Sequence, residues 1–119
     1  MAITPRSELR DVSGINDTDK ALIKAFMQGA VYCWVKNRKD EAFAVRDLMG
    51  GENFEWDRTP LMPLYRKHIR AGKDNDSAIK AAGQDLGWLV KSMLDEDRRT
   101  FVVGDAGLAN SYRWIGREP

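Results

Sequence analysis

The sequence holds a single cysteine, Cys33, and a single histidine, His68. One cysteine cannot form a disulfide within the chain, which suits a reducing compartment. One histidine and one cysteine also fall short of the ligand set that a common zinc site requires. Both residues lie among apolar neighbours at helical spacing. We therefore interpret Cys33 as a buried, inert thiol and His68 as a packed or hydrogen-bonded structural side chain.

Long apolar runs and an excess of one charge are also missing. The longest apolar stretch, residues 21–35, is interrupted by Lys24, Gln28 and Gly29, so it is too short and too polar to cross a bilayer. The N-terminus lacks the apolar core of a signal peptide. We therefore expect a soluble, cytoplasmic protein that makes no use of a membrane.

Charge is nearly balanced, with 19 basic and 18 acidic residues and a formal net charge of +1. Dedicated nucleic-acid binders are often far more basic, so this balance argues mildly against non-specific binding to polyanions. It still allows a local basic face, because the field at a site depends on where the charges sit.

Recognisable catalytic patterns are absent from the sequence. Gly50-Gly51 and the GDAG stretch at 104–107 lack the spacing of a phosphate-binding loop, and no Ser-His-Asp grouping has supporting spacing. We predict no enzymatic activity, no metal and no cofactor. A metal-dependent nuclease or nuclease accessory is the weakest alternative, since Asp95 and Asp97 at a helix end are more typical of solvent-facing acids.

The length of 119 residues and a hydrophobic content of 43% are typical of one globular domain. Residues 1–15 mix proline, glycine and charges without a sustained period, so we expect a flexible N-terminal arm. The remaining residues, 16–117, are then expected to form a single domain.

The first strong pattern predicts a helix over residues 17–37, capped by Asp17 or Thr18. Its apolar residues form two adjacent stripes, which together are broader than a helix with one partner usually needs. The helix is either the centre of the core or is shared with a second copy of the chain. The second interpretation predicts a homodimer through this helix.

Two further helices are predicted in the second half of the chain. Thr59-Pro60 is a suitable helix opening, and an apolar stripe follows from Leu61 to Ile69. The cluster 74–77 then caps a longer helix. Its predicted inward residues are Ile79, Ala82, Leu86, Leu89, Val90, Met93 and Leu94.

Strand signals occur at three places. Residues 43–45 alternate as in a short strand, and 45–49 fit one helical turn. Residues 99–103 and 111–115 are rich in β-formers, and they predict a hairpin around the loop 104–110. This loop is longer than a tight turn requires, so we expect its tip to be mobile. The predicted fold class is α+β and mainly helical, with three or four helices.

The order helix, short strand, helix, helix, hairpin resembles the winged-helix superfamily. The residues that carry the resemblance are WLVKSMLDED (88–97), RTFVV (99–103), GDAGLAN (104–110) and SYRWI (111–115). Phe43-Ala44-Val45 resembles the short strand that pairs with the wing in that fold. The resemblance covers most of residues 17–116 as a pattern of elements, without a signature of one family.

The resemblance implies a partner, double-stranded DNA, and a role in transcriptional or mobile-element regulation. In winged helices the helix before the hairpin commonly enters the major groove, and the wing contacts the backbone or the minor groove. On this chain that helix is 77–94. Ser77 and Gln84 would hydrogen-bond bases or phosphates, while Lys80 and Lys91 would neutralise phosphates. The predicted DNA-binding set is completed by Arg98, Arg99 and Arg113 at the hairpin and by Arg66, Lys67 and Arg70 in the basic segment LYRKHIRAGK.

A protein-interaction module, such as an adaptor or inhibitor, is the alternative from a different class. The hairpin loop carries Asp105 but no lysine or arginine, and the trio 95–97 after the expected recognition helix is acidic. Both features repel phosphate. They are compatible with a winged helix that docks on a protein instead of DNA.

Overall fold

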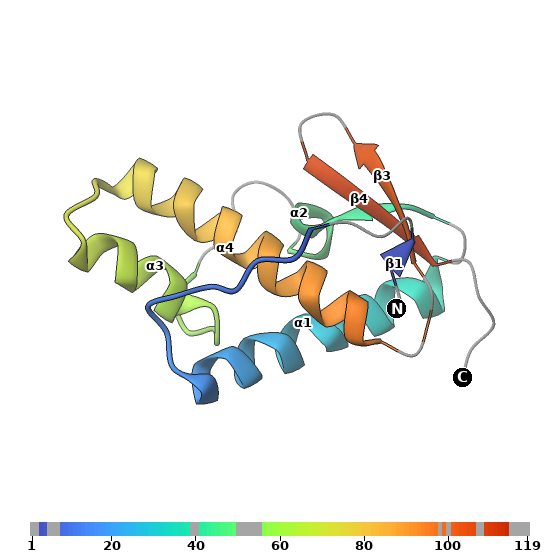
Figure 1. Cartoon of the computed structure of the whole chain (residues 1–119), viewed down its shortest axis with the longest axis horizontal. Helices are drawn as coiled ribbons and strands as arrows, with labels where there is room; N and C mark the ends of the chain where they lie inside the picture. The colour runs from blue at the N-terminus through green and yellow to red at the C-terminus, as the bar shows by residue number, and fades with distance from the viewer. Residues whose placement is uncertain are drawn as a thin grey trace.

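The chain is mainly helical, with one small sheet, and is therefore an α+β protein (Figure 1). The computed structural model describes residues 3–4, 8–38, 41–49, 56–97, 99, 101–106 and 109–114. The helices are α1 (Asp17–Asn37), α2 (Val45–Leu48), α3 (Met62–Arg70) and α4 (Asn75–Glu96). The strands are β1 (Ile3–Thr4), β2 (Phe43–Ala44), β3 (Phe101–Ala106) and β4 (Ala109–Trp114). This order confirms the predicted helix, short strand, helical turn, two helices and hairpin.

Helix α1 occupies the predicted residues, but its cap lies one residue earlier than expected. The side-chain Oδ1 of Asn16 accepts a hydrogen bond from the backbone N of Asp19 at 2.7 Å. Asparagine is among the best N-cap residues because its short side chain reaches the free N–H groups of the first turn. Asp17 and Thr18 are therefore helical residues and not the cap.

Only one of the two apolar stripes of α1 enters the core. Its buried residues are Ile23, Met27, Val31 and Val35. The other stripe is exposed, and it includes Cys33. The prediction of a buried cysteine was therefore wrong. The helix meets the rest of the domain along one side only, so the neighbouring stripe has nothing to pack against within the described chain.

Helices α3 and α4 form an antiparallel pair. Helix α3 begins at Met62, later than predicted, because the Thr59 hydroxyl accepts from the backbone N of Leu61 at 3.1 Å and caps a preceding turn. Helix α4 begins within the predicted cluster, where the Asp74 carboxylate accepts from the backbone N of Ser77 at 2.8 Å. All the predicted inward residues of α4 are buried except Ile79, which is exposed.

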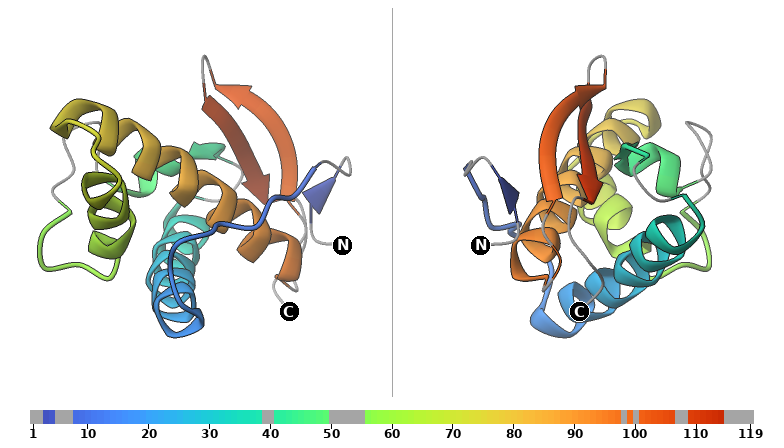
Figure 2. Two further views of the ribbon diagram at one scale, coloured as in Figure 1. Left: turned by 60° about the vertical axis from the view of Figure 1, so that its left-hand side comes forward. Right: turned by 90° about the vertical axis from the view of Figure 1, so that its right-hand side faces the viewer.

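The sheet has the strand order β1-β3-β4-β2. Strand β2 pairs antiparallel with β4, with Phe43 opposite Tyr112, as the prediction of a short strand beside the hairpin required. The prediction of a long loop over 104–110 was wrong, because β3 and β4 stay paired as far as Ala106 and Ala109. The hairpin consequently projects beyond the helices (Figure 2). The assignment to winged helices stays a prediction.

The aromatic ring of Phe43 lies at the centre of the core. It is fully buried, and its centroid lies 6.0 Å from Trp34, 6.2 Å from Phe101 and 6.0 Å from Tyr112. Ring pairs in this distance range contribute beyond the apolar area that they bury. The cluster joins α1, β2, β3 and β4, so it sets how the sheet sits against the helices.

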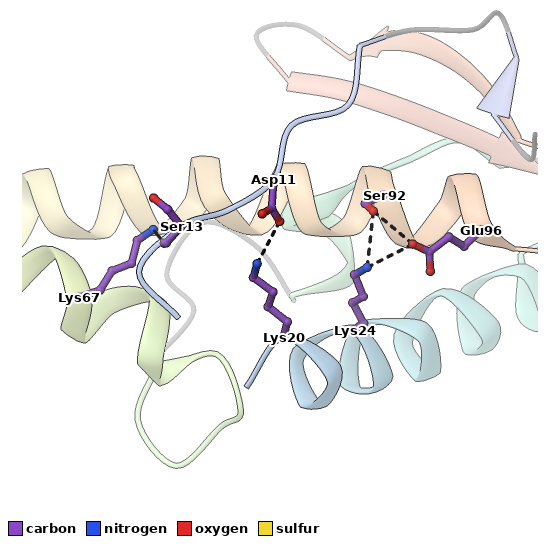
Figure 3. Close-up of polar contacts among 7 residues, drawn as sticks. All are labelled: Asp11, Ser13, Lys20, Lys24, Lys67, Ser92 and Glu96. Carbon is purple, nitrogen blue, oxygen red and sulfur yellow. Dashed lines mark hydrogen bonds and ion pairs between the residues drawn. The ribbon is translucent and has the colours of Figure 1, made fainter. Parts of the chain in front are cut away.

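Residues 8–13, which we name the N-terminal segment, cross the C-terminal half of α4 (Figures 1 and 3). Val12 is 2% exposed and belongs to the core. Lys20 Nζ donates to Asp11 Oδ1 at 2.9 Å, and Lys67 Nζ donates to the carbonyl oxygen of Ser13. Residues 1–15 were predicted to form a flexible arm outside the domain. The N-terminal segment is instead packed on the domain, and β1 pairs with β3 in the sheet.

None of the helices in the described part of the chain is long and apolar enough to cross a membrane.

Candidate nucleic-acid interface

The N-terminal half of α4 presents a polar face to solvent. Ser77, Lys80 and Gln84 are all exposed there, and their spacing of three and four residues places them on one side of the helix. Asp74 caps this end of the helix. Its carboxylate accepts a hydrogen bond from the backbone N–H of Ser77, and this bond holds the pKa of the Asp74 carboxyl below its ordinary value. Three residues that were predicted to contact DNA are therefore together and accessible.

Exposed cations without an acidic partner gather on the α3–α4 pair. We name Arg66, Arg70, Lys73 and Lys80 the α3–α4 basic surface. All four are exposed, and none of them makes an ion pair with a residue that the structure describes. Cations without counter-charges are those that a phosphate can neutralise, with release of counterions.

Two lysines of α1, in contrast, are paired with carboxylates. Lys20 Nζ lies 2.9 Å from Asp11 Oδ1, and Lys24 Nζ lies 3.3 Å from Glu96 Oε1 (Figure 3). These two lysines fix the N-terminal segment and α4 against α1. Exposed cations without an ion pair to a described residue also occur elsewhere, at Arg58 and at Arg113 of β4, but four of them lie on the α3–α4 pair and its connecting turn.

Lys67 belongs to a half-buried cluster and does not join the basic surface. Its Nζ lies 2.8 Å from Asp85 Oδ2, and the same oxygen lies 2.7 Å from His68 Nε2. Lys67 also donates to the carbonyl of Ser13. The charge of Lys67 is therefore already compensated within the fold, and its predicted contact with DNA stays a prediction that the proposal below does not use. The prediction that the His68 side chain is hydrogen-bonded is confirmed.

Lys91 was predicted to share the exposed stripe of α4, and this was wrong. It is only 7% exposed, and its Nζ lies 5.2 Å from the centroid of the Trp88 ring. The same ring receives the guanidinium of Arg10 from the N-terminal segment, with Cζ at 5.0 Å. The segment therefore occupies the half of the helix where Lys91 lies. No local pattern in α4 indicates this contact, since Arg10 is far away in sequence.

Arg99 is also buried, contrary to the prediction of a DNA contact. Its Nε and Nη2 donate to Asp97 Oδ1 and Oδ2 at 3.0 and 2.9 Å. Gln28 Nε2 adds a bond of 2.8 Å to Oδ2. Burial alone raises the pKa of Asp97, but the bonds from Arg99 and Gln28 outweigh it and bring that pKa below its ordinary value. The network ties α1 to the junction between α4 and β3.

The two remaining predicted residues lie at the hairpin. Arg113 is exposed on β4, opposite Val102 of β3, and its neighbours Tyr112 and Trp114 are buried. Its guanidinium makes no ion pair with a described residue. Arg98 lies outside the described residues. The structure thus leaves Ser77, Lys80, Gln84, Arg66, Arg70 and Arg113 accessible out of the predicted set.

The described part of the chain contains no cluster of three histidine, cysteine, aspartate or glutamate side chains that could hold a metal ion. Comparisons with protein-family models, curated proteins and solved structures find no match to this chain.

Proposed function

We propose that the protein binds double-stranded DNA through the α3–α4 basic surface. The observation that carries the proposal is the placement of Arg66, Arg70, Lys73 and Lys80, all exposed and without acidic partners among the described residues, around one helical pair. About four phosphates would be neutralised by these side chains, which is a common number for a small binding module.

The exposed half of α4 supplies the shape and the polar groups for this interaction. A helix is about 10–12 Å across, which matches the width of the major groove of about 12 Å. Lys80 would contact phosphate, while Gln84 and Ser77 carry hydrogen-bonding groups for base edges or backbone. Only the first three turns of α4 would enter the groove, because the N-terminal segment lies over the later turns.

The hairpin contributes less than the resemblance to winged helices implies. Arg113 is its one described and exposed arginine, and it lies on β4. In this proposal the protein acts as a small regulator of transcription or of a mobile element, and two copies act together. The DNA contact is then concentrated on α3 and α4, with the hairpin in a supporting position.

Protein binding is the second candidate, and two side chains favour it. Ile69 on α3 and Ile79 on α4 are exposed, although Ile79 was predicted to face inward. Arginines are enriched in protein–protein interfaces, so Arg66 and Arg70 on the same helical pair are compatible with this alternative as well. In that case the same helical pair would receive a partner protein, and its cations would set the orientation.

A binding assay with matched variants tests the proposal. Fluorescence anisotropy of a labelled duplex of about 25 base pairs is measured at 50 mM salt with the wild type, Arg66→Gln/Arg70→Gln and Lys80→Gln. We expect the double variant to bind roughly tenfold more weakly, and Lys80→Gln several-fold more weakly, because each loses phosphate contacts.

Lys24→Gln is the control, since it removes the same charge from a lysine that is paired with Glu96. It should bind DNA almost as the wild type does. Equal losses in all three variants would reduce the effect to net charge, and absence of wild-type binding would favour protein binding instead.

A further inference from the structure

The outward face of α1 is apolar along most of its length. Leu22 is 53% exposed and Tyr32 is 51% exposed, and Ala25 and Gly29 between them are also exposed. A side chain at Gly29 would meet nothing within 4 Å, so this part of the helix faces open space. Single exposed apolar residues are ordinary, but a continuous apolar stripe on a surface helix indicates a binding surface.

Charged side chains are sparse on this face, which reaches one only at its end, Lys36. Between Lys20 and Lys36 the only charged residue of α1 is Lys24, and its Nζ points to α4, where it contacts Ser92 and Glu96 (Figure 3). A helix that faces solvent normally carries charged and polar residues on its outer side. The inner side of α1 is already filled by the core, and the outer stripe is open to solvent apart from the Tyr32 ring, whose centroid lies 5.3 Å from Arg99 Cζ and 5.3 Å from Lys36 Nζ.

The stripe has the spacing of a helix–helix seam. Leu22, Ala25, Gly29, Tyr32 and Lys36 follow one another at intervals of three, four, three and four residues, which is the pattern by which two helices pack side by side. Leu22 and Tyr32 stand towards the two ends of this stripe and its two smallest residues stand in the middle, while Phe26, which is 41% exposed, stands at the edge of the stripe beside them. Small residues at the middle allow two helices to approach closely.

We propose that two copies of the chain pair through this face, with their α1 helices antiparallel and a two-fold axis at the level of Met27, the midpoint of α1. Leu22 of one copy then lies opposite Tyr32 of the second copy, and Ala25 lies opposite Gly29. Each large side chain meets a large one and each small one meets a small one. The surface is self-complementary, as a two-fold interface must be.

Electrostatics favour the antiparallel direction. The first turn of α1 carries Asp17 and Asp19, and its last turn carries Lys36. Antiparallel packing brings the acidic start of one helix close to the basic end of the second copy, and it also opposes the two helix dipoles. A parallel pair would instead place like charges side by side at both ends.

The interface is small, and this sets the expected strength. One helix from each copy buries less than about 1,200 Å² in total, which is typical of weak and reversible association. We therefore expect a dimer with a dissociation constant in the range of about 1–100 μM. The dimer forms through α1 and not through the α3–α4 basic surface. It is therefore expected even if the protein does not bind DNA.

Sedimentation equilibrium between 1 and 300 μM, in the absence of DNA, tests the pairing. The wild type should change from monomer to dimer over this range, and Leu22→Glu/Tyr32→Glu should stay monomeric. Ile79→Glu is the control, because Ile79 is an exposed apolar residue on α4 and should leave the dimer unchanged. Circular dichroism checks that each variant is folded. A wild type that stays monomeric at 300 μM would overturn the proposal.

Disulfide cross-linking tests the direction. At a rise of 1.5 Å per residue, the two Cys33 residues of an antiparallel pair lie about 18 Å apart along the axis, so the oxidised wild type should not be cross-linked. In Phe26→Cys/Cys33→Ser the new cysteines lie beside the axis, and oxidation at 300 μM should yield a covalent dimer. Cross-linking of the wild type but not of this variant would contradict the antiparallel arrangement.

Discussion

Arg99 and Asp97 form a bidentate ion pair, although only one residue separates them in the sequence. The guanidinium Nε and Nη2 lie 3.0 and 2.9 Å from the two carboxylate oxygens, and the side chains are 6% and 5% exposed. Gln28 of α1 binds the same carboxylate. The pair therefore links the end of α4 to the residues that lead into the hairpin, and the bond from Gln28 attaches this connection to α1.

Loss of one partner should destabilise the fold strongly. In Arg99→Met the Asp97 carboxylate stays buried without its cation, so we expect the free energy of unfolding to fall by about 3–5 kcal/mol. Asp97→Asn/Arg99→Met should recover a large part of this loss, since no buried charge remains. Urea unfolding followed by tryptophan fluorescence measures both. A loss below about 1 kcal/mol in the single variant would mean that the pair is solvated.

The same pair makes stability depend on pH. The pKa of Asp97 is lowered in the folded chain, because the bonds from Arg99 and Gln28 outweigh the opposing effect of burial. A lowered folded pKa contributes stability that is present above the unfolded value of about 3.9 and is lost as the pH falls through the folded value. The free energy of unfolding should therefore decrease as the pH is lowered below about 4.

Asp97→Asn/Arg99→Met isolates this contribution, because it removes the titrating carboxyl and its cation together. Asp11 and Asp74, whose pKa values are also lowered, remain in both proteins and contribute the same slope. The double variant should lose less stability than the wild type between pH 5 and pH 2 in urea titrations. Identical slopes would show that Asp97 titrates normally.

The features that were predictable from the sequence are local. Helix periodicity, a cap within the cluster 74–77 and the order of elements all depend on residues within a few positions of one another, and they were found as expected. The inward face of α4 was likewise predicted apart from Ile79. Three accessible residues of the candidate site, Ser77, Lys80 and Gln84, follow from the same local pattern.

The features that were missed depend on contacts between distant parts of the chain. Lys91 fits a polar stripe by its spacing, but a segment about eighty positions earlier covers that part of α4. Cys33 fits an apolar stripe, and its exposure depends on which of two equivalent stripes meets the core. Burial of this kind is decided by packing, and periodicity in a single helix does not encode it.

The path of the N-terminal segment depends on the turn at Gly14. This residue has a φ of +83°, and a Cβ there would lie 3.1 Å from Cδ of Lys67. Gly14→Ala should therefore lower the free energy of unfolding by about 1–2 kcal/mol, because left-handed backbone is unfavourable for alanine. Urea unfolding measures the change.

Gly83→Ala provides the matched control for this substitution. Gly83 is an exposed residue within α4, and a Cβ at this position would meet nothing within 4 Å. Alanine should here raise the free energy of unfolding by about 0.5–1 kcal/mol, because it lowers the entropy of the unfolded chain. If both substitutions moved stability in the same direction, the turn would not require glycine.

The salt dependence of DNA binding tests the central claim most directly. Binding of a random duplex to the wild type is measured from 50 to 300 mM salt, and the logarithm of the association constant is plotted against that of the salt concentration. Four phosphate contacts predict a slope of about −3.6, and Arg66→Gln/Arg70→Gln should reduce its magnitude by about 2. No binding at 50 mM salt, or a slope that the two substitutions leave unchanged, would contradict a phosphate-binding role for the α3–α4 basic surface.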